Sequence, residues 1–485
     1  MRKTVCAALA GLALAAGCKD NDGGDQKAPP PERGTAQAAR PTSGADIPYV
    51  ADTALTPQQI EQGRFAQDWT KVVKLDTTGA GVPVRNPEKL EQITARRVNS
   101  GAMVLPLSGQ VSGPSVLRVQ ILLDRAMFSP GEMDGHYGKN TAKAVYFFQQ
   151  SNNLPTTARV DSATFKALAR VGGSPDNLIV QHRLTADDVK GPFIEIPENV
   201  QAQAKLECSC YSSLSEKLGE TFHMAPDLLE MLNPGVNLDA LQAGQTINAP
   251  LVRAPNAGRD VRVAQIVVSG QGSYVQAQDA SGKVLFHFPS TLGATYDPSP
   301  SGEFKVTNIE QNPVWHYQPE LIATAPDTAT EAMVPGGPNN RVGAVWMALS
   351  APHYGIHGTN KPETIGYATS SGCVRLTNWD AQFLSLRISR GVPVHFKDIQ
   401  GRASDQSFGD QGMSGSNRAP GRGPATGARV DSAASAASGE AKGGSRGTPA
   451  GSRRSGSRDT ASSGRSGPGS GSGSGSSSRD TSKTR

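Results

Sequence analysis

Cys373 and His357 are the residues of this 485-residue chain whose types and spacing best suit nucleophilic chemistry. A thiol attacks a carbonyl as the thiolate, and because free thiols ionise near pH ~8.5, a nearby base or oriented backbone amides must help. His357 precedes the cysteine closely enough to be that base. Gly372 lets the backbone turn sharply, so that the N–H groups of Gly372 and Cys373 can face a developing oxyanion. The pair predicts acyl transfer through a covalent cysteine intermediate.

Residues 259–398 surround this pair and predict a mainly β domain. Short apolar or alternating runs are separated by turns rich in Gly and Asp, which is typical of sheets built from hairpins. We expect one helix over residues 378–390. We expect strands over residues 262–268, 273–278, 283–289, 302–306, 346–349, 355–357 and 392–396. His357 and Cys373 then stand at the ends of strands or loops, where their side chains can converge.

Residues 108–172 predict a small three-helix domain. The first helix carries apolar residues at helical spacing around Val119, and an Asp-Gly turn follows it. We expect the second helix to start at Thr141 and the third to follow Asp161, since both residue types favour helix N-termini. On physical grounds alone, this region is a packed helical module.

Residues 199–252 predict another small unit, with two helices and a closing strand over residues 211–222, 226–232 and 245–250. Cys208-Ser209-Cys210 occupies the place of a first strand, and its two cysteines could form a disulfide bond. Residues 49–107 are partly helical and have no assigned function. A helix with Pro at its first turn is expected from Thr56 to about Leu75.

The two ends of the chain differ in composition from the middle. Residues 1–17 combine a basic start, an apolar run and small residues, which is typical of a secretory signal. Cys18 follows Ala-Ala-Gly and begins a polar segment, so it resembles a lipidated cysteine at the start of a tether over residues 18–48. The alternative is an ordinary signal, with Cys18 incidental. Residues 399–485 are rich in Gly, Ser and Arg and predict a disordered tail.

The chain has a formal net charge of +5, and its positive excess lies in that tail. The tail could attract anionic wall polymer or a lipid surface, although a merely solvated tail is favoured. The charge therefore says little about the folded parts, and we expect no nucleic-acid partner.

Several separated motifs around the cysteine resemble the L,D-transpeptidase family, with its YkuD-type catalytic domain. They are Tyr354-Gly355-Ile356-His357-Gly358-Thr359-Asn360, Ile365-Gly366, Ser370-Ser371-Gly372-Cys373-Val374-Arg375-Leu376, and upstream Pro298–Phe304 and Pro335–Asn340. The resemblance implies that Cys373 attacks the carbonyl before the terminal D-Ala of a tetrapeptide stem and forms a thioester. His357 is then the base, and an amine of a neighbouring stem resolves the thioester.

The same resemblance suggests supporting residues, each with a structural alternative. Ser370 orients His357 or, with more weight, closes the turn before the cysteine. Arg375 holds a substrate carboxylate or, slightly favoured, braces the loop through an ion pair. Tyr354 lines the pocket or is a packed aromatic. Candidate substrate contacts also include Gly358 and Thr359.

Ser371, a further candidate supporting residue, stands where many relatives have a second histidine, so His357 is expected to be the sole base. His353 has the same strand parity as His357. At about 3.3 Å per residue, however, it would lie roughly 13 Å away along an extended strand, so we place it outside the site.

Residues 112–170 resemble the peptidoglycan-binding domain family. The motif residues are Asp134-Gly135, Gly138, Thr141, Ala144-Val145, Phe148-Gln149, Leu154-Pro155 and Asp161-Ser162-Ala163-Thr164. The alternative is that they only form turns and core, which is favoured for Phe147 and Phe148. The unit over 199–252 resembles a LysM-like glycan-binding module through Leu232-Asn233-Pro234 and Ala243-Gly244-Gln245.

We therefore expect a multidomain protein with disordered termini, a mainly β L,D-transpeptidase domain and a small helical peptidoglycan-binding domain. The expected partners are peptidoglycan and, through Cys18, a membrane on the periplasmic side of the cell envelope. We expect no cofactor and no metal. Two rival functions remain: a hydrolase of the same fold that uses water as acceptor, and a non-catalytic lipoprotein that tethers membrane to wall.

Overall fold

The computed structural model describes residues 55–399, apart from residues 79, 81, 296, 323–324 and 326–327. The predicted signal segment, Cys18 with its tether, and the tail from residue 400 onward lie outside the described residues. Among the described helices, none combines the length and apolar character that crossing a membrane requires.

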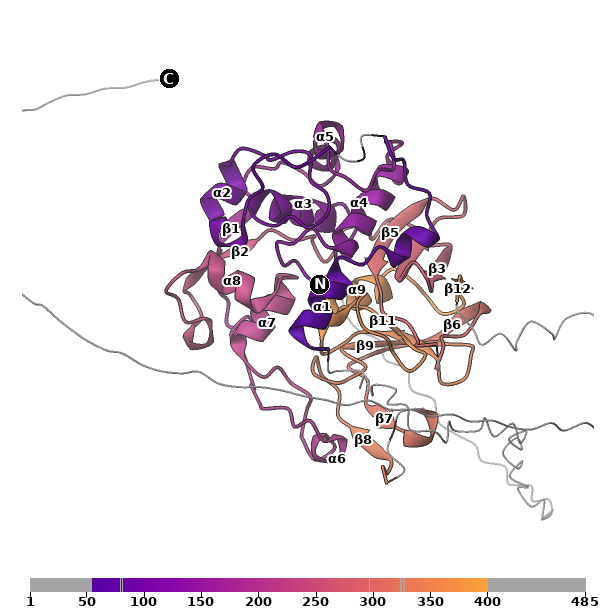
Figure 1. The fold of residues 1–485 in the computed structure, drawn as a ribbon. Helices are drawn as coiled ribbons and strands as arrows, with labels where there is room; N and C mark the ends of the chain where they lie inside the picture. The colour runs from indigo at the N-terminus through magenta and orange to yellow at the C-terminus, as the bar shows by residue number, and fades with distance from the viewer. Residues whose placement is uncertain are drawn as a thin grey trace, which may run out of the picture. The chain divides into compact units, whose positions relative to one another are not determined.

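Figure 1 shows helices gathered in the first part of the described chain and strands in the second. The helices are α1 Pro57–Arg64, α2 Ala95–Ser100, α3 Pro114–Arg125, α4 Lys139–Ser151, α5 Ser162–Val171, α6 Val200–Gln203, α7 Leu214–Thr221, α8 Pro226–Leu232 and α9 Asn378–Ser385. The strands are β1 Ile179–Arg183, β2 Thr246–Pro250, β3 Gln265–Ser269, β4 Tyr274–Gln278, β5 Val284–Pro289, β6 Gly302–Gln311, β7 Trp315–Tyr317, β8 Ala332–Val334, β9 Val345–Leu349, β10 Gly355–His357, β11 Val374–Arg375 and β12 Pro393–Lys397.

One mixed sheet forms the frame of the catalytic part of the chain. Its eight strands lie in the order β11-β10-β9-β6-β12-β3-β4-β5. The β10–β11 and β12–β3 pairs are parallel, whereas the other neighbours are antiparallel. The mainly β fold class predicted from the sequence is confirmed, although the parallel pairs show that the sheet is not built from hairpins alone.

The two ends of this sheet meet beside the cysteine. After β5, the backbone of Thr291 exchanges hydrogen bonds of 2.8 and 3.0 Å with Arg375 of β11. Gly293 forms a further bridge with Ser370. The sheet therefore curls until its first and last strands are joined at the loop that carries Cys373. That curvature brings segments from opposite ends of the domain to one place.

Helices α3, α4 and α5 form the predicted three-helix domain. The carboxylate of Asp161 accepts a hydrogen bond from the backbone N–H of Thr164 at 2.7 Å, which is the expected cap of α5. The prediction that α4 starts at Thr141 is wrong: α4 starts at Lys139, and Gly138 precedes it. Thr141 lies inside the first turn, where its hydroxyl accepts a hydrogen bond from Gln120 instead.

Two buried glutamine amides tie the turns of this domain together. Gln120 donates to Asp134 at 2.9 Å and accepts from the backbone N–H of Gly135 at 2.8 Å. Gln149 similarly holds Ala158 and Thr164. The motif residues Asp134, Gly135, Gln149 and Thr164 therefore take part in holding the fold of the domain.

The unit around α7 and α8 contains a strand that the sequence did not reveal. Helix α8 has the predicted bounds, and β2 is the predicted closing strand. The antiparallel partner of β2 is β1, which precedes the predicted range 199–252. The expectation that Cys208-Ser209-Cys210 takes the place of the first strand is therefore wrong. Those two cysteines form a disulfide bond with each other.

The long helix expected from Thr56 to about Leu75 is also wrong. Helix α1 ends at Arg64, and a short 3-10 helix over Asp68–Lys71 follows. Thr56 caps α1 as the sequence suggested. Trp69 is 1% exposed and packs its ring 6.0 Å from that of Tyr146 on α4, so this segment adds to the core of the helical domain.

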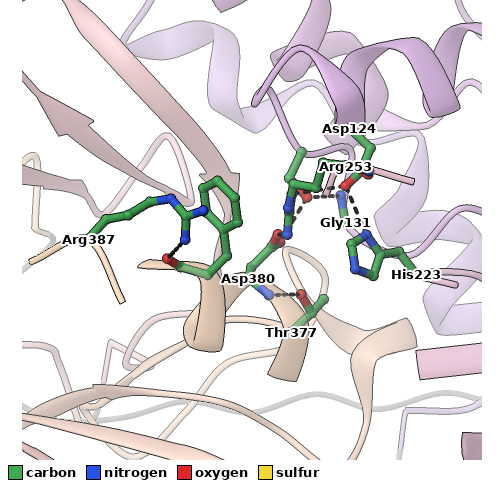
Figure 2. A network of polar contacts seen from close by, with 9 residues as sticks. Asp124, Gly131, His223, Arg253, Thr377, Asp380 and Arg387 are labelled. Atoms are coloured by element: carbon green, nitrogen blue, oxygen red, sulfur yellow. Dashed lines mark hydrogen bonds and ion pairs between the residues drawn. The ribbon is translucent and has the colours of Figure 1, made fainter. Parts of the chain in front are cut away.

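A buried polar network joins the helical part of the chain to α9 of the β domain (Figure 2). Arg253 lies between Asp124 of α3 and Asp380 of α9, at 2.9 Å from the first and 2.5 Å from the second. His223 contacts Asp124 at 3.0 Å, and Ser129 donates a hydrogen bond to Asp380. Helix α9 is therefore anchored from the side of the helical domain.

Candidate active site

His357 ends β10 and is 3% exposed. Its Nδ1 lies 2.7 Å from the carbonyl oxygen of Gly358. Because a carbonyl only accepts hydrogen bonds, Nδ1 must carry a proton, and Nε2 keeps the lone pair of the neutral ring. The ring also stacks on Trp346, with centroids 5.3 Å apart. One tautomer and one ring orientation are therefore favoured.

The surroundings of His357 keep the ring neutral. Burial disfavours the charged form, and the positive charge of Arg375 adds to this, so that the pKa of His357 falls to about 3. At neutral pH the side chain is therefore a neutral base, not an imidazolium.

Cys373 follows Gly372 in the bend that precedes β11. Gly372 has a φ of +96°, a conformation that favours glycine, and a Cβ there would meet the ring of Tyr354 at 2.7 Å. Cys373 is partly exposed and is not part of a disulfide bond. Burial raises the pKa of Tyr354, and the charges of Asp297 and Cys373 raise it further. Tyr354 thus lies close to the sulfur.

The main chain of His353 contacts the cysteine. The Sγ of Cys373 is 3.7 Å from the carbonyl oxygen of His353. The estimate of roughly 13 Å from His357 assumed an extended strand, but His353 is in a turn with a φ of +66° and precedes β10. The contact runs through the main chain, and the His353 side chain is exposed.

The register of the sheet explains why the side chains of Cys373 and His357 lie on the same face. Ile356 lies opposite Val374, and His357 lies opposite Arg375. Since alternate residues of a strand point to the same face, Cys373 shares a face with Arg375 and hence with His357. The thiol thus comes from the bend before β11, and the base comes from the end of its parallel neighbour β10.

Ser370 closes the turn before the cysteine. Its hydroxyl donates to the carbonyl oxygen of Cys373 at 2.5 Å, and its backbone N–H donates to Leu292 at 2.8 Å. This is the role to which the sequence analysis gave more weight. The loop is also braced by the helical domain, because Asn140 of α4 donates to the carbonyl oxygen of Ile365 at 2.8 Å.

Comparison with known proteins agrees with this geometry. The family model described as "L,D-transpeptidase catalytic domain" matches residues 264–396, and that described as "Putative peptidoglycan binding domain" matches residues 112–168. A protein of Bacillus licheniformis named "Putative L,D-transpeptidase YkuD" is 32% identical over 179 residues, which cover 37% of this chain and 90% of the relative. Its namesake in Bacillus subtilis is 30% identical over 173 residues, covering 36% and 87%.

The chain belongs to the L,D-transpeptidase family. The predicted family, enzyme class and peptidoglycan-binding domain are confirmed, and a cell-envelope setting agrees with them.

In this transpeptidase, Gly358 and Thr359 are buried beneath Asn378, the first residue of α9. The Oδ1 of Asn378 accepts from the backbone N–H of Thr359 at 3.1 Å. A Cβ on Gly358 would meet the same oxygen at 2.1 Å. Gly358 and Thr359 therefore form the loop that holds the ring of His357 in place. Asn378 was not predicted as a site residue, although it is a polar residue at the start of the helix expected after the cysteine motif.

The upstream motif Pro335–Asn340 is held by the disulfide-bonded loop of the transpeptidase. Ser209, between the two bridged cysteines, donates its backbone N–H to Gly336 at 3.0 Å and accepts from Asn339 at 2.9 Å. A Cβ on Gly337 would meet the carbonyl oxygen of Ser209 at 2.2 Å. The motif thus forms a close backbone contact with the unit that precedes the catalytic domain.

A cavity of about 590 Å³ lies between the helical units and the segment that follows His357. Its wall includes the carboxylates Glu132, Glu198, Glu216, Glu220 and Glu363. Burial raises the pKa of Glu220 to about 8, and Glu216 adds to the shift. Cys373 does not line this cavity. Within the described part of the chain, no group of three His, Cys, Asp or Glu side chains is arranged to hold a metal ion.

Proposed function

We propose that this L,D-transpeptidase acts on peptidoglycan stem peptides through a thioester on Cys373. The observation that carries the proposal is the position of the partly exposed Cys373, in the bend before β11, next to the buried, neutral His357 at the end of the parallel neighbour β10. Nucleophilic catalysis by cysteine requires such a base close to the sulfur. The peptidoglycan-binding domain supplies the reason to choose wall peptides as the substrate.

The first half-reaction forms the thioester and releases D-Ala. Nε2 of His357 takes the thiol proton, and the sulfur attacks the carbonyl carbon before the terminal D-Ala of a tetrapeptide stem. The N–H groups of Gly372 and Cys373 stabilise the oxyanion, each contributing roughly 3–4 kcal/mol when preorganised. His357 then gives its proton to the leaving amine as the C–N bond breaks.

The second half-reaction transfers the acyl group. An acceptor amine attacks the thioester, loses a proton to His357, and displaces the sulfur as the C–S bond breaks. The products are a new amide and the regenerated thiol, so no external oxidant or cofactor enters. The new amide is a 3-3 cross-link between stems or an attachment of protein to the wall.

Other residues have narrower roles in this proposal. Ser370 and Ser371 shape the loop that precedes Gly372, and Tyr354 lines the approach to the sulfur. Arg375 serves as the candidate partner of a substrate carboxylate and also influences His357 through its charge.

The remaining parts of the chain hold the enzyme on its substrate. In the unit that resembles a LysM-like module, β1 and β2 form an antiparallel pair that encloses α7 and α8 along the chain. With the helical domain at 108–172, it would raise the effective concentration of wall peptides without new contacts at the sulfur. Binding of N-acetylglucosamine oligomers to α7 and α8, followed by amide chemical shifts, tests the module.

Membrane attachment through Cys18 completes the proposal. One lipid chain binds a membrane reversibly, and a second chain makes the attachment stable. The domain ranges proposed are 1–17 signal, 18–48 tether, 49–107 partly helical segment, 108–172, 199–252 extended by β1, 259–398 catalytic and 399–485 tail. Incorporation of a palmitate analogue into the wild type, and its loss in Cys18→Ala, tests the anchor.

Intact-mass measurement with a carbapenem such as imipenem tests the catalytic proposal. We expect one adduct on the wild type, none on Cys373→Ala, and a rate at least about 100-fold lower for His357→Asn. His353→Asn is the matched control, because the contact of residue 353 with the sulfur runs through its main chain. A folded wild type without an adduct would contradict the proposal. Muropeptide analysis of the products then separates an amine acceptor from water, which is the hydrolase alternative.

A further inference from the structure

The first turn of α9 follows the cysteine motif closely in the chain and contacts the loop that follows His357. Asn378 stands two residues after Leu376 of the cysteine motif and is 1% exposed. Its Oδ1 accepts from the backbone N–H groups of Thr359 and Ala344, at 3.1 and 3.0 Å. Thr359 directly follows Gly358, whose carbonyl oxygen accepts from Nδ1 of His357. One side chain therefore fixes the Gly358–Thr359 peptide, which carries the hydrogen-bond acceptor of His357.

Two glycines allow this close approach. A Cβ on Gly358 would meet the Oδ1 of Asn378 at 2.1 Å, and a Cβ on Gly343 would meet it at 2.2 Å. At contacts under 3 Å, any other residue type would require the Asn378 amide or the backbone to move. The Gly358 of the His-Gly-Thr motif is thus explained by the amide that lies against it, and the amide has little room to shift.

The other end of the Asn378 amide is held by the unit that precedes the catalytic domain. Its Nδ2 donates to Oε1 of Glu220 at 2.7 Å and to the carbonyl oxygen of Pro338 at 3.1 Å. The second carboxyl oxygen of Glu220 accepts from the hydroxyl of Tyr211 at 3.2 Å. With two acceptors at the nitrogen and two donors at the oxygen, the amide has a single favourable orientation.

Helix α9 itself cannot easily follow a movement of this loop. The hydroxyl of Thr377 caps the helix by accepting from the N–H of Asp380. Arg253 and Ser129 then bind the Asp380 carboxylate from outside the catalytic domain (Figure 2). Asn378 therefore reaches the histidine loop from a fixed support.

We propose that Asn378 is a positioning residue for His357, and that Glu220 on α7 fixes the orientation of its amide. The inference rests on the proposed role of His357 as the base. Neither residue touches the reacting atoms. Both act through the Gly358–Thr359 peptide, so the unit that precedes the catalytic domain contributes directly to the geometry of the base.

The test compares variants of the full chain for acylation of Cys373 by imipenem. Asn378→Ala should lower the rate about 100-fold, because a displacement of the base near 1 Å costs that much. Asn99→Ala is the matched control: this side chain also pairs with backbone N–H and C=O groups, of Ile179, but far along the chain from His357. The control should keep the wild-type rate.

Two readouts separate positioning from a loss of folded protein. With the loop loosened, water reaches His357 and its pKa rises, so the acid limb of the pH–rate profile should move up towards ~6.5 in Asn378→Ala. A smaller folded fraction would instead lower the rate equally at every pH. Nitrogen-15 spectra of labelled histidine should also show the Nδ1–H tautomer of His357 in the wild type and its loss in the variant. This spectrum does not depend on acylation.

The Glu220 variants keep the proposal falsifiable if Asn378→Ala fails to fold. Glu220→Gln retains an acceptor for Asn378 and should stay within about threefold of the wild-type rate, whereas Glu220→Ala should lose about tenfold. Equal rates and pH profiles for wild type, Asn378→Ala and Glu220→Ala would overturn the inference. A wild type that shows the Nδ1–H signal but forms no adduct would overturn the proposed function and leave the positioning role standing.

Discussion

At the scale of single residues, the cysteine loop follows from local chemistry that a sequence can reveal. Gly372 was expected for its backbone freedom and adopts a φ of +96°. Ser370 closes the turn, as its position three residues before the cysteine suggested. The strand geometry assumed for His353 does not apply, because this residue lies in a turn. Asn378 was not predicted because its role depends on hydrogen bonds with Thr359 and Glu220, which are distant from it in the sequence.

The charge of Arg375 gives a prediction at this scale. Burial is the first cause that lowers the pKa of His357, and Arg375 is the second. Arg375→Met removes a cation that opposes protonation, so the pKa of His357 should rise. The neutral base is then lost at a higher pH as acid is added, and the acid limb of the imipenem acylation profile should move upwards.

Arg375→Lys serves as the control because it keeps the positive charge. Each profile is compared with its own plateau, so that a weaker affinity for the carboxylate of imipenem does not affect the position of the limb. Acid limbs of Arg375→Met and wild type that coincide would show that the charge does not act on His357.

At the scale of elements, alternation and turn residues predicted most strands of the catalytic sheet, and α8 was predicted at its observed bounds. The strands β7 and β8 were missed, because they are three residues long and form a separate two-stranded sheet in the described part of the chain. Strand β1 was missed because its partner β2 lies more than 60 residues further along the chain. Strand order, and the joining of β5 to β11, depend on contacts across the whole domain.

The contact of β5 with α4 contains a buried histidine. Both ring nitrogens of His287 are buried without a hydrogen-bond partner in the described structure, and the ring lies 4.7 Å from that of Phe147. Burial, with a further contribution from Lys143, holds the pKa of His287 well below its ordinary value. The folded chain therefore keeps this ring neutral, whereas the unfolded chain protonates it below about pH 6.5.

His287→Phe should stabilise the interface between β5 and α4. At pH 7 the gain in the free energy of unfolding should be about 1–3 kcal/mol, because the variant buries no unsatisfied nitrogen. Above pH ~6.5, His287 does not make the free energy of unfolding of the wild type depend on pH. Below this pH, protonation of His287 in the unfolded chain lowers that free energy. The gain from the substitution should therefore grow between pH 7 and pH 5, as measured by urea unfolding.

His316→Phe provides the comparison for this experiment. Its side chain on β7 is 46% exposed, so the substitution should change stability little at either pH. A difference between His287→Phe and wild type that is the same at pH 7 and pH 5 would contradict the argument.

At the scale of the whole molecule, the described wall-binding and catalytic parts are joined by charge as well as by packing. Asp124, Arg253 and Asp380 belong to α3, the connecting segment and α9, and their side chains are at most 1% exposed. Burial alone would raise the pKa of Asp124, but Arg253 and His223 outweigh it and hold the pKa at about 2. The sequence offered no sign of this network, because its members are more than 100 residues apart.

Removal of the Arg253 guanidinium should lower the free energy of unfolding of the full chain by more than the loss of its packing contacts explains. Arg253→Met leaves two buried carboxylates without their cation, and breaking such a pair typically costs about 3–5 kcal/mol. Adding Asp124→Asn and Asp380→Asn to the same chain removes both orphaned charges, and replacement of a whole buried ionic group is often nearly neutral. Urea unfolding of the full chain should therefore show a large loss for the single variant and recovery of most of it in the triple variant. Equal losses for the two would mean that Arg253 contributes by packing on Phe383, 4.5 Å from its guanidinium, and not by joining the two parts through charge.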